Sequence, residues 1–402
     1  MISQRSDLTF KHNLKQGRHG WLRLTPAYSI KIVQNVLASI GKPEFVLDPF
    51  SGTGTTGLVC AELGIKSDLV EINPFLVWLA AAKIAHYHAD ELDAANALAR
   101  DVASKVCQNM TVDDLWIPPL NYIDRWWLPE RLIVLANLFD RLKNICGETA
   151  AVKLCLIAFC KVVINWSNAA FNHQSMSFKK HHQRFLPEER DMIINDFITQ
   201  VQQIAASAKL PVLSKVTIHQ GDSRCLDRLL SRTYDCVITS PPYPNRMSYI
   251  REVRPYMYWL GFLKSAREAG ELDWQAIGGT WGIATSRLRW WQPGNMKIPH
   301  EGFENTIEQI SVQSPILGNY VHKYFRDIAT HIDRLSRVLA AGAKIYYIVG
   351  NSKFYDTLVP VEQIYMSLLR EYGFSNVSSA VLRKRNSKKE LYEFAVSADW
   401  LG

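Results

Sequence analysis

The stretch FVLDPFSGTGTTGL, residues 45–58, decides the fold of this chain. It begins with a short apolar run at 45–50 and continues through a glycine turn into a helical pattern at 57–63. Glycine at positions such as Gly52 and Gly54 permits positive φ angles and lets the backbone approach a ligand closely. The stretch therefore predicts a strand, a glycine turn and a helix.

The same alternation continues on both sides of a long interruption. Further strands are predicted at 67–72, 216–219, 234–239 and 344–349, and helices at 74–86, 320–339 and 361–372. Two closing strands, 378–384 and 391–397, are predicted to pair antiparallel across the polar turn 386–389. The predicted fold class is α/β, with a mostly parallel sheet and an antiparallel closing hairpin.

Two segments depart from the alternation. Residues 89–210 have helical periodicity and predict a large helical insertion, whereas 265–317 are rich in Gly, Trp and Arg and are predicted to be irregular.

The composition favours a globular chain with a polyanionic partner. Hydrophobic residues make up 48% and charged residues 21%, and the formal net charge is +8 with a pI near 9.0. No apolar run reaches the roughly 18 residues of a membrane span, and residues 1–15 do not resemble a signal peptide, so a cytoplasmic location is expected. Lys and Arg in excess suit a nucleic acid, because they neutralise phosphates. The seven cysteines form no CxxC pair, so neither a metal site nor a disulfide framework is predicted.

The glycine turn by itself leaves several ligands open. No lysine follows the glycines, which excludes a P-loop. Gly52, Gly54 and Gly57 have the GxGxxG spacing and Glu71 fits its acidic partner, so a nicotinamide dinucleotide remains an alternative, as does a purely structural turn. A methyl donor fits as well: Asp48 could accept from a methionine amino group, and Glu71 could accept from both ribose hydroxyls.

A second motif, Ser240-Pro241-Pro242-Tyr243, follows the predicted strand 234–239 directly. Two prolines cannot donate within a sheet, so they indicate a loop whose carbonyl groups face a ligand. An exocyclic base amine is a poor nucleophile because its lone pair is delocalised into the ring. The Ser240 side chain and the Pro241 carbonyl could accept its two N–H bonds, and Tyr243 could stack on an extruded base. A proline-terminated strand with an incidental tyrosine is the alternative.

Together these motifs resemble those of the DNA amino-methyltransferases, the cytosine-N4 and adenine-N6 enzymes of bacterial restriction–modification systems. The matching segments are DPFSGTGTT (48–56), VEINPF (70–75), GDS (221–223) and TSPPY (239–243). HGWLRLTPAYS (19–29) is similar to the segment that closes over the methionine end of the cofactor, and 372–394 to the final helix and hairpin.

The resemblance implies a Rossmann-like fold that uses S-adenosyl-L-methionine. The residues expected to bind this cofactor are Trp21, Thr25, Asp48, Pro49, Phe50, Gly52, Gly54, Thr55, Thr56, Glu71, Ile72, Asn73, Asp222 and Ser223. The expected catalytic residues are Ser240, Pro241, Pro242 and Tyr243. Serine at the first catalytic position is typical of the cytosine-N4 enzymes, whereas Asp or Asn there usually marks adenine enzymes.

The resemblance also implies a division of the chain. Residues 1–88, 213–264 and 319–402 are expected to form the methyltransferase domain, and 89–212 and 265–318 are insertions that could recognise DNA. The third and fourth motifs are adjacent, so no recognition domain lies between them, in contrast to the family pattern.

Candidate DNA contacts come from both insertions and from the loop after Tyr243. Residues 245–249 and Arg251 could line the pocket of a flipped base. The residues expected to contact DNA are Asn245, Arg246, Arg251, Arg287, Arg289, Trp290, Trp291, Lys179 and Lys180. A solvated helix end and a loop whose tryptophans pack on the domain are the corresponding alternatives.

The expected partners are double-stranded DNA and a separately encoded restriction endonuclease, in a bacterial cytoplasm and close to the nucleoid. A methyltransferase acting on RNA or on a protein glutamine remains an alternative, since related motifs serve both. A non-catalytic DNA-binding relative is a third.

Overall fold

A seven-stranded sheet forms the centre of the molecule in the computed structural model, which describes residues 3–25, 27–106, 111–145, 147–170, 177–179, 184–385 and 390–402. Its strands are β1 (Phe45–Asp48), β2 (Lys66–Glu71), β5 (Val216–Gln220), β6 (Tyr234–Thr239), β7 (Leu339–Gly350), β10 (Ser375–Lys384) and β11 (Tyr392–Trp400). They lie in the order β10-β11-β7-β6-β1-β2-β5. Strands β7, β6, β1, β2 and β5 pair in parallel, and β11 is antiparallel to both β7 and β10. The predicted sheet with its antiparallel closing pair is confirmed; the turn predicted at 386–389 lies outside the described residues.

The topology brings two loops to one place. From β1 the chain proceeds outward through β2 and β5, and it then returns to the other side of β1 with β6, where Val46 is opposite Cys236 and Leu47 opposite Val237. In an open α/β sheet, such a reversal leaves a crevice at the carboxyl ends of the strands, and ligands bind there. The glycine turn after β1 and the Ser-Pro-Pro-Tyr loop after β6 therefore share this edge.

Helices cover both faces of the sheet. Helices α2 (Ile30–Ile40) and α3 (Thr55–Glu62) pack on the face that carries Val46, Cys236 and Ile238. Helices α14 (Pro315–Ser336) and α15 (Val361–Glu371) pack on the opposite face, which carries Leu47 and Val237. The alternation of apolar side chains along β1 and β6 thus supplies both cores.

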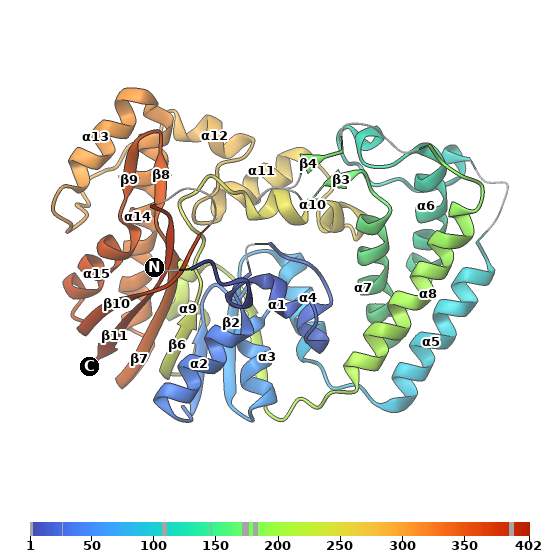
Figure 1. Ribbon diagram of the computed structural model, residues 1–402, viewed down its shortest axis with the longest axis horizontal. Coiled ribbons are helices and arrows are strands. Elements are labelled where there is room, and N and C mark those ends of the chain that lie inside the picture. The colour runs from blue at the N-terminus through green and yellow to red at the C-terminus, as the bar shows by residue number, and fades with distance from the viewer. Residues whose placement is uncertain are drawn as a thin grey trace.

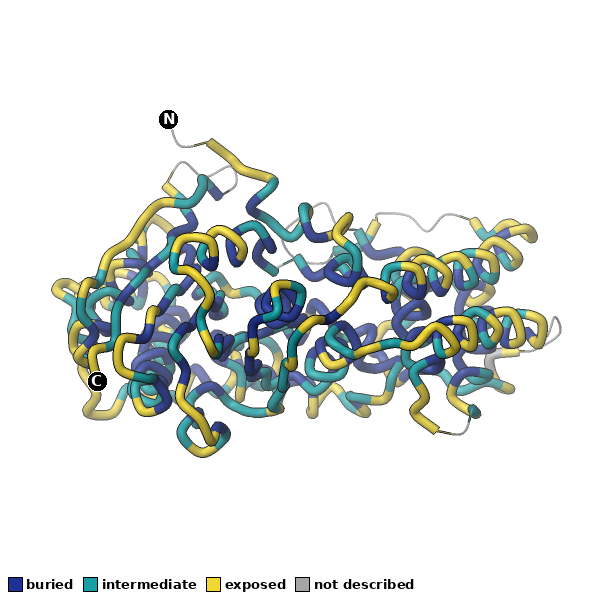
Figure 2. Tube along the Cα trace, turned by 90° about the horizontal axis from the view of Figure 1, so that it is seen from below, coloured by how far each residue is buried: buried dark blue, intermediate teal, exposed yellow. Residues whose placement is uncertain are grey.

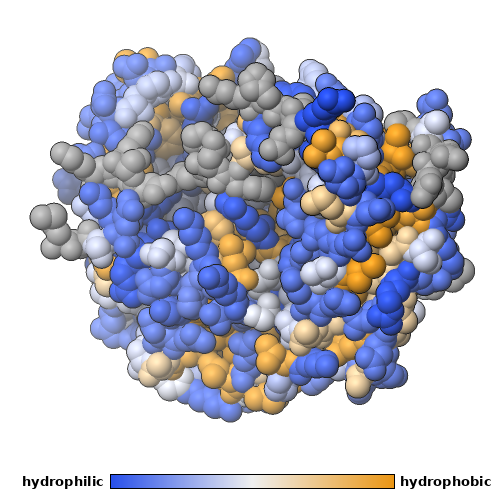
Figure 3. Space-filling model, turned by 45° about the vertical axis from the view of Figure 1, so that its right-hand side comes forward, coloured by the Kyte–Doolittle hydropathy of each residue, from blue (hydrophilic) through white to orange (hydrophobic). Residues whose placement is uncertain are grey.

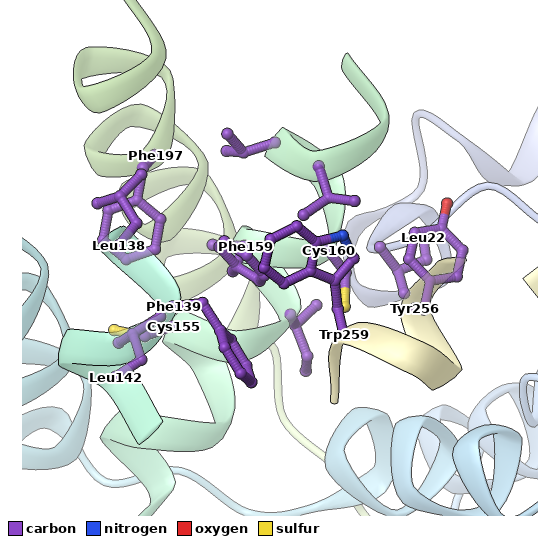
Figure 4. Packing of buried hydrophobic residues seen from close by; sticks show 14 of the residues in the cluster. Leu22, Leu138, Phe139, Leu142, Cys155, Phe159, Cys160, Phe197, Tyr256 and Trp259 are labelled. Carbon is purple, nitrogen blue, oxygen red and sulfur yellow. The ribbon is translucent and has the colours of Figure 1, made fainter. Parts of the chain in front are cut away.

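The helical insertion lies beside the sheet (Figure 1), with its buried residues on the inner sides of its helices (Figure 2). It consists of α5 (Ala89–Ser104), α6 (Pro129–Lys143), α7 (Ala150–Asn165) and α8 (Glu189–Ala208), which pack on one another. Helix α10 (Tyr249–Trp259), which follows the Ser-Pro-Pro-Tyr loop, joins this core through Trp259, whose ring packs on Phe139 and Phe159 (Figure 4). The periodicity at 89–210 therefore predicted the helices correctly.

The prediction that 265–317 is irregular is wrong in large part. This segment contains α11 (Ala266–Gln275), α12 (Ile283–Leu288) and α13 (Phe303–Gln313). Ser265 begins α11 by accepting from the amide of Glu268, and Glu268 in turn accepts from the amide of Lys264. This serine-to-glutamate spacing is a helix-start signal that the content of Gly, Trp and Arg obscured.

The remaining elements are short. They are η1 (Ser6–Leu8), α1 (Phe10–Asn13), η2 (Gly17–Gly20), α4 (Pro74–Ile84), η3 (Val112–Asp114), η4 (Ile123–Arg125), β3 (Ala169–Ala170), β4 (Ser177–Phe178), η5 (Ser223–Cys225), α9 (Leu226–Leu229), β8 (Ser352–Phe354) and β9 (Thr357–Val359). Viewed with the insertion turned forward, the surface is mainly hydrophilic with apolar patches between (Figure 3). None of the helices in the described ranges is long and apolar enough to span a membrane.

Candidate active site

A cavity opens where the loops after β1, β2, β5 and β6 meet. It encloses about 880 Å³, including the part that is open to solvent. Of the residues expected to bind a cofactor or to act in catalysis, those that line it are Pro49, Phe50, Gly52, Thr55, Glu71, Ile72, Asn73, Asp222, Ser223, Ser240 and Pro242. The two motifs recognised separately in the sequence thus face one space.

The glycine turn needs its glycines for different reasons. Gly52 and Gly54 have φ angles of 51° and 78°, in the left-handed region that disfavours other residues. A Cβ atom on Gly54 would lie 3.0 Å from the Cβ of Ala80, because α4 passes close to the turn. The turn is therefore fixed both by backbone conformation and by packing.

Asp48 is buried beneath this turn and does not line the cavity. Its carboxylate is fully buried and accepts from the hydroxyls of Thr56 and Thr239, each at 2.6 Å, and from Tyr28 at 3.3 Å. Burial raises the pKa of this carboxyl, and the hydroxyl donors oppose that rise. The predicted contact with a methionine amino group is not supported, because donors within the protein occupy the carboxylate. Gly54 and Thr56 likewise support the turn and do not line the cavity.

Glu71 is the carboxylate that the cavity presents beside the turn. Its two oxygens accept from the backbone amides of Gly52 at 2.9 Å and Asn73 at 2.8 Å. Burial raises the pKa of Glu71 to about 7, although these amides favour the charged form. Each oxygen keeps a lone pair for a ligand hydroxyl, so the geometry suits a diol such as a ribose.

Asp222 presents a second carboxylate across the cavity. The guanidinium of Arg224 holds it with three contacts, at 3.0 Å to Oδ1 and at 3.1 and 2.6 Å to Oδ2, and also binds Asp327 of α14 at 2.9 Å. On the inner side, Nδ1 of His331 lies 3.0 Å from the carbonyl oxygen of Ser223. Burial lowers the pKa of His331 to about 4, so this imidazole is neutral near pH 7.

The N-terminal segment contributes residues other than those expected. Trp21 is 2% exposed, and its indole N–H donates to Ser207 of the insertion at 2.7 Å, so it belongs to the core and does not line the cavity where a cofactor contact was predicted. Thr25 does not line the cavity either, whereas Leu24, Ala27 and Tyr28 do. The segment thus reaches the cavity, but its sequence has no periodicity that shows which side chains point inward.

Ser240 lies at the cavity wall with its hydroxyl oriented by the sheet. Its Oγ donates to the backbone carbonyl of Ile348 in β7 at 3.2 Å. That bond uses the hydroxyl proton, so the oxygen lone pairs are left to accept from a ligand. The loop is held further by Tyr324 of α14, which donates to the Pro242 carbonyl at 2.8 Å. Pro241 is buried and does not line the cavity.

Tyr243 does not occupy the predicted position at the cavity. Its hydroxyl donates to Glu393 at 3.1 Å, and the guanidinium of Arg385 covers its ring at 5.0 Å. Tyr249 lines the cavity instead, and its hydroxyl accepts from the Tyr243 amide at 3.3 Å. Arg385 therefore covers one face of the Tyr243 ring, and the Tyr243 hydroxyl lies 3.4 Å from Oγ of Ser240, while the tyrosine that lines the cavity is Tyr249.

One wall of the cavity was missed altogether. Residues 275–277, at the end of α11, line it, and the carbonyl of Gln275 accepts from Arg224. Nothing in the sequence links these residues to the cavity, because the link depends on where the second insertion folds. Ser51 and Ile250, which also line it, adjoin the predicted motifs.

Some of the residues predicted to contact DNA are exposed to solvent, and others interact with neighbouring residues of the protein. Lys179, Arg246, Arg251, Arg289 and Trp290 are exposed, Trp290 to 79%. Lys180 lies outside the described residues.

The other three predicted DNA contacts are engaged within the protein. Arg287 forms an ion pair with Glu271 at 2.7 Å, and Trp291 packs edge-on against His322 at 5.6 Å. The side-chain oxygen of Asn245 accepts from the Met247 amide at 3.1 Å. Because packing of α11, α12 and α14 creates the first two contacts, the local sequence could not reveal them.

Comparisons with known proteins agree with this geometry. The model of the N6/N4 DNA methylase family matches residues 30–82, which contain the glycine turn and Glu71. The type II methyltransferase M.BsoBI of Geobacillus stearothermophilus is 22% identical over 444 residues, covering 96% of this chain and 85% of its own. M.AvaI of Nostoc sp. is 22% identical over 419 residues, covering 96% and 86%, and M.MvaI of Kocuria varians is 21% identical over 383 residues, covering 87% and 79%.

The family match covers the glycine turn, the similarity to the type II methyltransferases extends over nearly the whole chain, and the fold places both motifs at one sheet edge. These similarities support the assignment of the chain to the DNA amino-methyltransferases, the family of N6/N4 DNA methylases.

Proposed function

We propose that this protein transfers a methyl group from S-adenosyl-L-methionine to the exocyclic N4 amine of a cytosine flipped out of duplex DNA. One observation carries the proposal: Ser240 of the catalytic loop lines the same cavity as Gly52 and Glu71 of the glycine turn. A nucleophile held by the first and a donor held by the others would meet within that cavity.

The chain's own residues fit the donor. Glu71 offers two oxygens for the ribose hydroxyls, and Asp222 offers an acceptor for the adenine amino group on the neighbouring wall. Apolar side chains between them, Phe50, Ile72 and Ile277, suit the faces of an adenine ring. The bound donor would supply an electrophilic methyl group attached to a sulfonium.

Ser240 would activate the amine by accepting one of its N–H bonds. The Ile348 carbonyl engages the serine proton, so the oxygen is oriented as an acceptor before the substrate arrives. The amine would then be held with its lone pair toward the methyl group. Catalysis is then positioning and electrostatic stabilisation without a covalent intermediate.

A serine at this position favours cytosine over adenine by the family pattern.

Methyl transfer from a labelled donor tests the proposal against its alternatives. We expect label in duplex DNA and none in tRNA or in the protein fraction. Label confined to RNA or protein would replace the DNA assignment, and label in adenine would correct the base.

Changing Glu71 to Ala should weaken donor binding by about tenfold to a hundredfold, the range of a lost hydrogen bond to a charged group.

The affinity of the protein for the donor should also depend on pH. Because ribose hydroxyls favour the charged carboxylate, binding lowers a pKa that is about 7 in the free protein. Donor affinity should therefore rise up to about pH 7 and level off above it. Calorimetric titration at several pH values measures both effects, and an unchanged affinity in E71A would remove Glu71 from the donor site.

The two tyrosines can be separated by replacing each with Ala. If Tyr249 holds the extruded base, Y249A should raise KM for DNA and leave donor affinity nearly unchanged. Replacing Tyr243 should act through the loop that it fixes to Glu393 and Arg385, and should lower kcat. Steady-state kinetics with a fluorescent base analogue at the target position distinguish the two. The reverse pattern would return the stacking role to Tyr243.

As a type II methyltransferase it would protect the sites cut by a separately encoded restriction endonuclease. Supporting this is its similarity to type II methyltransferases along most of the chain.

A further inference from the structure

A group of cations lies where α10 meets the helical insertion. Arg251 and Arg254 extend from α10, and Arg125 and Lys179 come from η4 and the residue after β4 of the insertion. Arg125, Lys179 and Arg251 are exposed and Arg254 is half-buried. Within the described ranges none of the four forms an ion pair, in contrast to Arg287 or Arg224. We call these four residues the arginine surface.

Aromatic rings hold the guanidinium groups in place. Arg254 lies 5.2 Å from the ring centroid of Trp126 and 5.5 Å from that of Trp281. Arg125 lies 4.7 Å from the ring of Phe178. Stacking of this kind orients a guanidinium without using its N–H groups, of which Arg254 donates one to the backbone carbonyl of Arg251 at 3.0 Å.

The backbone beneath these side chains is also fixed. The side-chain amide of Asn168 donates to the carbonyls of Arg125 and Lys179, each at 3.4 Å. Asn168 also donates its backbone N–H to Trp126 at 2.7 Å and accepts from the Lys179 amide at 2.9 Å. The strand pair β3–β4 and η4 therefore form one support, to which α10 is joined through Arg254 and Trp126.

These positive charges act on one another. The pKa of Arg254 is lowered to about 10, first by burial and then by the charge of Arg251, with a smaller contribution from Arg125, while Glu252 opposes the shift. Keeping like charges together costs free energy, and an anionic ligand would relieve that cost.

The surface adjoins the mouth of the cavity. Ser248 caps α10 by accepting from the Arg251 amide at 3.0 Å, and its hydroxyl donates to Asp273 at 2.5 Å. Asp273 accepts in turn from the Trp281 amide at 2.7 Å. Tyr249 and Ile250, which line the cavity, are the residues next to Ser248. The arginines are thus tied to the loop that would hold the base.

We propose that the arginine surface binds consecutive phosphates of the DNA strand that carries the target base, beside the flipped nucleotide. The proposal rests on the proposed function and specifies where the substrate strand lies. A polyphosphate strand matches the observations because it supplies several anions in a row, one for each separate cation.

Binding of a labelled DNA duplex at increasing salt tests the proposal, with R125A, R251A and the double variant compared with wild type. Both side chains are exposed, so the substitutions should leave the fold and donor binding intact. Each lost phosphate contact should weaken DNA binding and lower the slope of log affinity against log salt by about 0.9. KM for DNA should rise with kcat nearly retained. R100A, which removes an exposed arginine of α5 in the same insertion, is the matched control and should behave as wild type.

The outcomes separate this proposal from the proposed function. If wild type methylates DNA and the double variant retains the wild-type salt slope and KM, the arginine surface is wrong and the function stands. If R100A lowers the slope as much as the surface variants do, binding is diffuse and the surface is again wrong. If wild type binds the donor but neither binds nor methylates a duplex, the arginine surface and the proposed function both fail.

For Arg254, R254K should retain more DNA affinity than R254A, since lysine loses the stacked guanidinium but keeps the positive charge.

Discussion

Replacing Ser240 with Ala should lower the rate of methyl transfer by about a hundredfold to a thousandfold, the usual effect of removing one pre-oriented hydrogen-bonding group from an active site. The Ser240 hydroxyl is anchored to Ile348 and is oriented before substrate binds. Its loss removes an acceptor from the amine and leaves Glu71 and Asp222 untouched. Single-turnover kinetics should therefore show a slow chemical step, whereas calorimetry should give a nearly unchanged donor affinity.

Two further variants sharpen this result. S240T keeps a hydroxyl on the same carbon and should recover part of the rate. S39A removes an exposed hydroxyl of α2 that donates to the Val36 carbonyl of its own helix, away from the cavity, and should have no effect. A large loss of donor affinity in S240A, with a normal rate at saturation, would show that the serine contacts the donor and not the amine.

Replacing Trp259 with Ala should destabilise the protein by about 3–5 kcal/mol, the usual cost of emptying a large aromatic site in a core. Trp259 is fully buried, and its ring contacts Phe139, Phe159 and Trp127 at centroid distances of 5.6, 5.3 and 5.8 Å. These neighbours belong to the insertion, so the cavity would open between α10 and α6–α7. Denaturant unfolding measures the loss, and DNA binding should weaken as well because α10 carries Arg251 and Arg254.

W259F is the matched control for this prediction. The indole N–H of Trp259 is buried and has no hydrogen-bond partner in the described part of the chain. Phe therefore loses ring volume but no hydrogen bond, and we expect a clearly smaller cost than for Ala. Equal costs for W259F and W259A would mean that the indole N–H is bonded after all and that packing is not the main contribution.

The sheet could be predicted from the sequence because its signals are local. YDCVIT at 234–239 became β6 without a shift in its bounds, and the glycine turn followed β1 as expected. The parallel topology then brought Ser240 and Gly52 to one edge, which required no knowledge of distant contacts. The fold and the position of the cavity follow from such patterns.

The roles of single side chains depended on partners that the sequence does not connect. Asp48 and Glu71 each end a strand, yet only Glu71 reaches the cavity, because Thr56 and Thr239 surround the other carboxylate. The face of Tyr243 is covered by Arg385 from the opposite end of the chain. Glu271 likewise engages Arg287 across two helices that were not expected.

Identification of the methylated nucleoside tests the account most directly. DNA incubated with the protein and donor would be digested to nucleosides and analysed by mass spectrometry, with S240A in parallel. The account predicts N4-methyl-2′-deoxycytidine from the wild-type protein and little or none from S240A. A methyl group on a ring carbon, or an equal yield from both proteins, would contradict the claim that the loop after β6 presents a base amine to the donor.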